Sequence, residues 1–269
     1  MVRVRLDLSY DGTDFAGWAR QPGQRTVQGT VEDALHTILR GPAVLTVAGR
    51  TDAGVHATGQ VAHADIPAGS WADLCDSLLR RLAGVLPRDV RVRSLAPSPA
   101  GFDARFSALT RCYGYRLTDS PWGVEPLRRP DTVHWPRRLD PHAMQVAAAG
   151  LLGAHDFAAY CRRRPNATTI RTLTKLNWRR DPDGTVVACF EADAFCHSMV
   201  RSLVGALLDV GTGLRPTDWP IRILRGGVRD ARVNVAPAHG LTLLQVRYPP
   251  AAELAERAAF TRRRRDVRS

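Results

Sequence analysis

The first half of the chain alternates strand and helix patterns. Apolar residues at positions 2, 4, 6 and 8 alternate with polar ones and predict a half-buried strand. Helical spacing follows over residues 26–39, with Thr26 as the expected N-cap. Strand patterns at 43–48 and 60–66 precede a second helix, which a Ser70–Asp73 capping box opens and Gly84 closes. With a strand at 90–95, the order is β-α-β-β-α-β, the ferredoxin-like pattern.

The second half repeats this order. Asp140 and Pro141 are typical of a helix start, and the residues from Asp181 to Gly184 predict a turn. The helix that starts at Asp140 is expected to run to about residue 152, and two further helices are expected at 196–210 and 217–225. Strands are expected at 111–118, 173–179, 185–193 and 241–247. We therefore predict an α/β (α+β) fold of two tandem ferredoxin-like halves with mainly antiparallel sheets. The expected divisions are 1–106, 107–250 and a basic, flexible tail at 251–269.

The charge of the chain indicates a polyanionic partner. Its formal net charge is +12, and Lys175 is its only lysine. Arginine forks onto phosphate and stacks on bases, so a basic, arginine-rich chain favours RNA or DNA as the partner. Coding bias would explain arginine in place of lysine, but not the net excess. Arginine clusters occur at 128–129, 137–138, 162–164 and 262–265.

The cysteines and the first residues of the chain indicate the cellular compartment. Its five cysteines are odd in number and include no C-x-x-C pair, which argues against a zinc site or a disulfide framework and favours a reducing cytoplasm. The chain goes straight into a strand pattern without a signal peptide, and no apolar run is long enough to cross a bilayer.

The segment 49–59 carries the strongest chemical pattern, GRTDAGVHATG. It places Arg50 and Asp52 within a glycine-rich loop between two strand patterns. Glycine allows backbone shapes that other residues resist and lets a ligand approach closely. Such a carboxylate either serves catalysis or caps its own turn, and the spacing alone leaves both open.

Five segments, in order, carry a resemblance to a known family. They are YDGTDFAGW at 10–18, the loop at 49–59, RCYGY at 111–115, MVRSLVG at 199–205 and APAHGL at 236–241. Together they closely resemble the motifs of the TruA family of tRNA pseudouridine synthases over nearly the whole chain. The resemblance implies the pseudouridine synthase fold and homodimers. It implies that uridine becomes pseudouridine at positions 38, 39 and 40 of the tRNA anticodon stem-loop, with no cofactor or metal.

The resemblance also implies residue roles. Asp52 matches the catalytic aspartate, which attacks the ribose or otherwise assists departure of the uracil. Arg201 would be the cation that keeps Asp52 ionised despite desolvation. Tyr113 would stack on the flipped uracil, and Arg50 would expel or hold the target base. In the same reading His56 shapes the loop or contacts RNA, and Gln60 and Arg20 are further RNA-contact candidates; Tyr115 is the structural neighbour of Tyr113.

The sequence departs from the family pattern at two places. An Asn expected before the Leu86-Pro87 turn is missing, and CHS at 196–198 replaces a pair of histidines. Neither change touches Asp52, Tyr113 or Arg201. Because Asp52 lies in the first half and the other two in the second, we expect the active site between the halves. The alternative is a non-catalytic structured-RNA-binding module or tRNA chaperone. A nucleotide hydrolase is disfavoured because no phosphate loop or metal carboxylate cluster appears.

Overall fold

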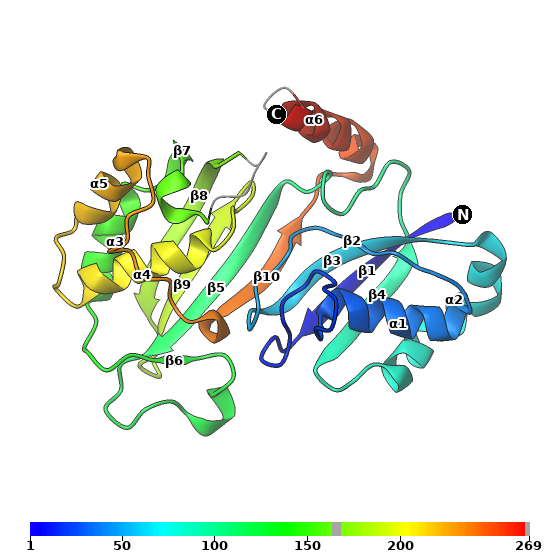
Figure 1. Cartoon of the computed structure of the whole chain (residues 1–269), viewed down its shortest axis with the longest axis horizontal. Coiled ribbons are helices and arrows are strands. Elements are labelled where there is room, and N and C mark those ends of the chain that lie inside the picture. Colours follow the sequence, from blue (N-terminus) through cyan, green and yellow to red (C-terminus); the bar gives the residue numbers. More distant parts are fainter. Residues whose placement is uncertain (163–167, 267–269) are drawn as a thin grey trace. The chain divides into compact units, whose positions relative to one another are not determined.

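The computed structural model describes residues 1–162 and 168–266 (Figure 1). They form two compact units. Of the described residues, unit 1 contains Met1–Leu109 and 243–266, and unit 2 contains those within Thr110–Thr242. The sequence-based division at 106/107 gave the last strand to the second half, whereas most of that strand groups with unit 1. Within the described ranges, no helix has the length and apolarity needed to cross a membrane.

Unit 1 has the predicted β-α-β-β-α-β order. Its elements are β1 (Val2–Tyr10), α1 (Val27–Leu39), β2 (Thr46–Val47), β3 (His56–Ile66), α2 (Ala68–Val85) and β4 (Val90–Pro97). The sheet runs β4-β1-β3, β2 pairs with β3, and all of these pairs are antiparallel. Val4, Leu6 and Leu8 are buried in the core, as their alternation predicts. The predicted strand at 43–48 shortens to the two residues of β2.

The two helices of unit 1 begin differently. Thr26 caps α1 as predicted, because its hydroxyl accepts a hydrogen bond from the Gly29 N–H. The prediction of Ser70 as the N-cap of α2 is wrong. This helix begins at Ala68, directly after Pro67, and has no side-chain cap. Pro67 fixes its own φ near the helical value, at −53°, so the chain turns into the helix as soon as β3 ends.

The strands of unit 2 are also mainly antiparallel. Its elements are β5 (Thr110–Thr118), β6 (Val133–His134), α3 (Pro141–Ala149), β7 (Gly153–Asp156), β8 (Ile170–Arg180), β9 (Val186–Ala192), α4 (Met199–Gly211) and α5 (Trp219–Gly226). The strand order is β5-β9-β8-β7, and β6 pairs with β5 in parallel. Asp140 caps α3 through hydrogen bonds from the N–H groups of His142 and Ala143. The sequence did not predict the short strands β6 and β7.

The last part of the chain that the structure describes, up to residue 266, packs against unit 1. Strand β10 (Leu241–Arg247) lies beside β3, and helix α6 (Leu254–Asp266, red in Figure 1) follows it. Ser107 donates its hydroxyl hydrogen to the Leu254 carbonyl at 3.0 Å, and Arg262 pairs with Asp103 at 2.6 Å. The structure thus differs from the loose tail expected at 251–269. The apolar contacts of Leu254 and Ala258, both buried, explain why the segment is helical.

Candidate active site

The loop that presents Asp52 joins β2 to β3. Gln60 on β3 is fully buried and donates from Nε2 to the Gly49 carbonyl at 2.8 Å and to the Tyr10 hydroxyl at 3.2 Å. The Tyr10 and Thr51 hydroxyls are hydrogen-bonded at 2.8 Å. Asp52 itself is half-buried. A buried polar network that is satisfied in this way is rigid, so it fixes the backbone on either side of Asp52.

A second loop, residues 11–18, supports the first through its backbone. The Trp18 N–H donates to the Thr51 carbonyl at 3.1 Å, and the Gly54 N–H donates to the Phe15 carbonyl at 3.2 Å. A Cβ added at Gly12 would overlap the Val55 carbonyl oxygen. The motif at 10–18 therefore forms the backbone support for the Asp52 loop, which explains why both motifs occur in one chain.

His56 and Gln60 shape the loop. The Gly12 N–H donates to His56 Nδ1 at 2.9 Å, which leaves the proton of the neutral ring on Nε2. Asp11 Oδ1 also lies 3.1 Å from Nδ1, a contact that becomes an ion pair only if His56 is protonated. His56 is 6% exposed and Gln60 is not exposed. Their buried side chains hold the loop together in this conformation, and RNA contact by either residue stays a prediction.

The two arginines of the predicted site in unit 1 differ in their contacts. Arg20 pairs with Glu32 at 3.0 Å and with Asp33 at 2.6 Å, so it holds α1. Arg50 is exposed, and its guanidinium makes no hydrogen bond or ion pair within the part of the chain that the structure describes. Arg50 is therefore available to a ligand next to Asp52.

Tyr113 lies on β5 of unit 2. It is opposite Phe190 on β9 and is 7% exposed. Its ring packs edge-on against Phe195, with centroids 5.2 Å apart and an angle of 88° between the ring planes. Sequence reasoning missed Phe195, which stands four residues before the MVR motif. Its closeness to that motif was the sequence signal that could have identified Phe195.

Arg201 is held at the beginning of α4. Its Nε donates to the Ala236 carbonyl at 2.7 Å, and the Ala236 N–H donates to the Arg201 carbonyl at 3.0 Å. The buried Tyr115 hydroxyl donates to the adjacent Pro237 carbonyl at 2.9 Å. Burial raises the pKa of Tyr115, and the charge of Arg201 partly opposes that rise. The segment 236–240 thus secures Arg201 and Tyr115 together, and Tyr115 has a structural role.

Two cysteines near α4 are joined, although the sequence argued against disulfides. Cys161 follows the short 3-10 helix Ala158–Tyr160 and forms a disulfide with Cys196, across a Cα–Cα distance of 5.7 Å. That distance lies within the range that disulfides span. Odd cysteine counts and spacing rules do not exclude a single bridge between segments that the fold brings together. The bridge ties the approach to α4, and hence to Arg201, to the rest of unit 2.

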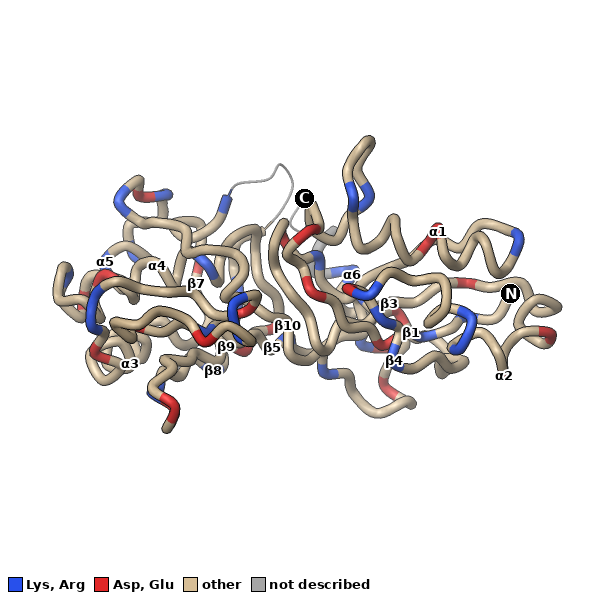
Figure 2. Tube along the Cα trace, turned by 90° about the horizontal axis from the view of Figure 1, so that it is seen from below, with Lys and Arg blue, Asp and Glu red and all other residues tan. Residues whose placement is uncertain are grey.

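Basic residues occur throughout both units (blue in Figure 2), interspersed with acidic ones. Many are paired, as Arg25 is with Asp89. Of the arginine clusters in the sequence, residues 163 and 164 lie outside the described residues. No group of three or more potential metal-ligating His, Cys, Asp or Glu side chains occurs among the residues described.

Comparisons with known proteins agree with these motifs. The family model described as tRNA pseudouridine synthase matches residues 8–107 and 147–249. A tRNA pseudouridine synthase A from Frankia casuarinae is 67% identical over 97% of this chain and 95% of its own length. Those of Streptomyces griseus and Mycobacterium leprae are 60% and 52% identical, over 97% and 100% of this chain and 93% and 96% of their own lengths.

A solved H/ACA ribonucleoprotein bound to a substrate RNA containing 2′-deoxyuridine aligns over 94% of this chain and 71% of that chain, with 10% identity and a TM-score of 0.33. A TM-score this low does not support a shared fold. The family model covers the loop of Asp52 and the helix of Arg201, and the relative from Mycobacterium leprae, which covers the whole chain, also includes the strand of Tyr113. The chain therefore belongs to the tRNA pseudouridine synthase family, a family of isomerases.

Proposed function

We propose that the protein isomerises uridine to pseudouridine at positions 38, 39 and 40 in the anticodon stem-loop of tRNA, with Asp52 as the catalytic carboxylate. The observation that carries this proposal is the presentation of Asp52. A buried Gln60–Tyr10–Thr51 network and a second loop fix its backbone, and Arg50 lies exposed two residues away. A mere turn would not need support from two sides, whereas a catalytic group must be held in place.

The reaction needs no group from outside. The C1′–N1 bond breaks, the uracil turns, and a C1′–C5 bond forms. C5 then loses its proton, and N1 gains one. Asp52 attacks the ribose or promotes departure of the uracil. The target base must first leave its stack, and Arg50 expels or holds the base during that step. No redox step or cofactor is needed for this balance.

Tyr113 and Arg201 complete the proposed set. Tyr113 would stack on the uracil, a contact worth roughly 1–3 kcal/mol, and its hydroxyl would assist removal of the C5 proton. Arg201 would offset the negative charge of Asp52, because a cation near a desolvated carboxylate favours its ionised form. The hydrogen bond from Arg201 Nε to the Ala236 carbonyl fixes the side chain at the beginning of α4. Arg20 remains a weaker RNA-contact candidate on the exposed surface.

The alternative is a protein that binds structured RNA without chemistry. The net charge of +12 serves both functions equally and does not separate them. The support around Asp52 favours the enzyme. As the family resemblance implies, we also propose that the protein acts in the cytoplasm as a homodimer. Light scattering at micromolar concentration checks the dimer, and a mass of one chain would contradict it.

The test is tritium release from tRNA labelled at uridine C5. We expect release from transcripts that carry uridine at any of positions 38 to 40, and none when all three are cytidine. Asp52→Asn should abolish release and leave the Kd for tRNA within about threefold. Asp14→Asn, an exposed aspartate of the supporting loop, is the matched control and should stay active. Wild-type protein that binds tRNA without releasing tritium would support the binding module instead.

A further inference from the structure

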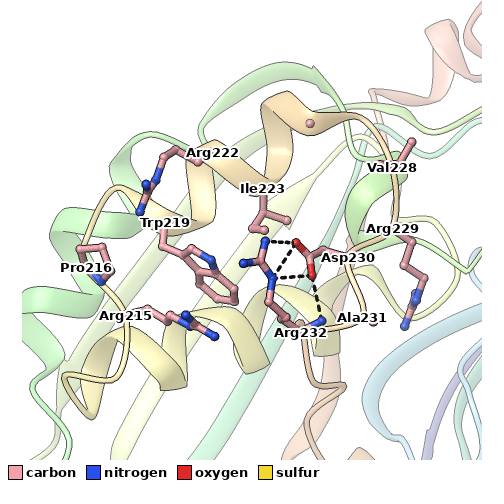
Figure 3. Close-up of a pocket in the computed structure, with 11 residues that line it drawn as sticks. Arg215, Pro216, Trp219, Arg222, Ile223, Val228, Arg229, Asp230, Ala231 and Arg232 are labelled. Carbon is pink, nitrogen blue, oxygen red and sulfur yellow. Dashed lines mark hydrogen bonds and ion pairs between the residues drawn. The ribbon is translucent and has the colours of Figure 1, made fainter.

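A pocket of about 670 Å³ lies in unit 2, outside the residues assigned to the reaction. It is formed by α5 and the loops on either side of it (Figure 3). Its polar lining consists mainly of Arg215, Arg222, Arg229, Asp230 and Arg232, and Trp219 and Ile223 contribute its apolar part. None of these residues belongs to the motifs that identified the family.

The lining is strongly positive because four arginines face one aspartate. Asp230 pairs with Arg232 at 2.6 Å, as the dashed lines of Figure 3 mark, and this pairing holds the pKa of Asp230 at about 2. Asp230 is therefore ionised at neutral pH and offsets Arg232. Arg229 is exposed and makes no hydrogen bond or ion pair within the described ranges.

Two of the remaining arginines are pre-positioned. The Arg215 guanidinium lies 5.1 Å from the centroid of the Trp219 ring, a cation–π contact that restricts it without using its donors. Arg222 makes an exposed ion pair with Asp218 at 3.2 Å, which is weak enough to yield to a ligand. Guanidinium groups held in this way match the oxygens of a phosphate through paired hydrogen bonds.

One buried donor in the pocket lacks an acceptor. Trp219 is 4% exposed, and its Nε1–H has no hydrogen-bond partner among the described residues. A buried donor without an acceptor costs about 1–3 kcal/mol. The lining thus combines cations, an apolar surface and an unmet donor, and phosphate esters supply the complementary acceptors.

The pocket lies apart from Arg201 along α4. An adjoining hollow includes Asp209 and Arg215 at the far end of this helix. Asp209 is eight residues beyond Arg201, about 12 Å along the helix axis. A group bound in the pocket is therefore separate from one that Arg201 contacts.

We propose that this pocket is a second RNA-binding site, which holds backbone phosphate of the tRNA away from the target uridine. The proposal rests on the proposed function, because tRNA is the substrate there. Phosphate contacts position an RNA without reading its sequence, so the site contributes affinity and leaves the chemical step unchanged. The open, arginine-lined pocket has no set of buried groups that would select one small nucleotide.

The test compares two double variants of equal charge. Arg222→Gln/Arg229→Gln removes two pocket arginines. Arg129→Gln/Arg225→Gln removes two exposed arginines of the same unit that do not line the pocket, one of them on α5 itself. Kd for full-length tRNA is measured at several salt concentrations, together with KM and kcat. For the pocket variant we expect Kd and KM to rise about tenfold, kcat to stay within twofold, and the salt slope to fall by about 1–2.

Equal Kd values and salt slopes for the two double variants would overturn the proposal. If the proposed function fails, wild-type protein releases no tritium, and measurement of tRNA binding still tests the pocket in that case.

Calorimetric titration with inorganic phosphate distinguishes free phosphate from RNA phosphate as the ligand of the pocket. Micromolar phosphate binding that the pocket variant loses, with tRNA affinity unchanged, would make this a small-anion site. Arg229→Gln alone, which removes no contact, guards against loss of folding.

Discussion

Gln60 reaches back eleven residues along the chain and donates a hydrogen bond to the Gly49 carbonyl at 2.8 Å. This contact joins the start of the Asp52 loop to the strand that follows it. The position of the carboxylate thus depends on a side chain that makes no contact with substrate in the proposed mechanism.

Replacement of Gln60 tests that dependence. Gln60→Leu keeps the volume but leaves the Gly49 carbonyl without its donor, so we expect a loss of roughly 1–3 kcal/mol in the free energy of unfolding. Loss of loop geometry should lower kcat at least tenfold while the Kd for tRNA changes little. Tyr10→Phe, which removes only a hydroxyl from the network, should show a smaller effect of the same sign. A fully active Gln60→Leu variant would contradict the assigned role.

Two glycines of unit 1 predict opposite effects for the same change to alanine. Gly12→Ala places a methyl group against the Val55 carbonyl, so the variant should lose stability and activity together. Gly84→Ala lies in α2, where an added Cβ meets nothing within 4 Å, and should raise stability by about 0.5–1 kcal/mol. Chemical denaturation of both variants checks the pair, and equal shifts would show that the Gly12 contact is unimportant.

Arg50 and Arg20 should separate function from stability. Arg50→Ala removes no intramolecular contact, so its unfolding free energy should stay within about 0.5 kcal/mol. Its kcat/KM should fall about 10- to 150-fold, the value of one charged hydrogen bond to substrate. Arg20→Ala breaks the contacts with Glu32 and Asp33 and should cost up to about 1 kcal/mol of stability. Unchanged kcat/KM for Arg50→Ala would remove this residue from the site.

His63 makes unit 1 sensitive to mild acid. Burial, and then the charge of Arg3, lower the pKa of His63, whose Nδ1 accepts the Ala104 N–H at 3.0 Å. The unfolded chain therefore binds a proton near pH 6.5 while the folded chain resists it, and stability falls as pH drops from 7.5 to 5.5. The loss reaches up to about 1.4 kcal/mol at pH 5.5. His63→Gln retains an acceptor and should show a flatter pH dependence in urea unfolding; parallel curves would contradict this assignment.

The thiols can be counted. Protein purified without reductant should expose three alkylatable cysteines after denaturation, namely Cys75, Cys112 and Cys189, and five after reduction. The hydrogen bond with Cys112 lowers the pKa of Cys189, so Cys189 should be alkylated in the folded protein at a lower pH than is usual for a thiol. Mass spectrometry of the alkylated peptides identifies each site. Five reactive cysteines without reductant would contradict the Cys161–Cys196 bridge.

Local patterns predicted the parts of the fold that local physics determines. Thr26 and Asp140 cap their helices as expected, since capping involves only the next three residues. β6 and β7 were missed because two- and four-residue strands depend on partners distant in sequence rather than on their own pattern. Helix α6 was missed for a similar reason: its low amphipathicity gives little signal, and contacts with residues 101–107 hold it.

The sequence suggests which residues belong to the candidate site, but not which contacts hold them in place. The sequence motifs indicate Asp52, Tyr113 and Arg201 as a set. The hydrogen bonds of Gln60, His56 and Gly12 depend on how two loops meet, which a pattern of residue types does not encode. The same holds for the arginine pocket, because its members come from a helix and two loops with no common spacing.

The final strand and helix give the protein an order of assembly. Unit 1 consists of the first 109 residues and residues 243–266, whereas unit 2 runs from Thr110 to Thr242. During synthesis, the segment that emerges first must wait for the last to complete its sheet, and unit 2 is fully available earlier. Because domains generally fold as units, the half that carries Asp52 reaches its final form only once nearly the whole chain has left the ribosome. A prematurely terminated chain would therefore lack a finished Asp52 loop.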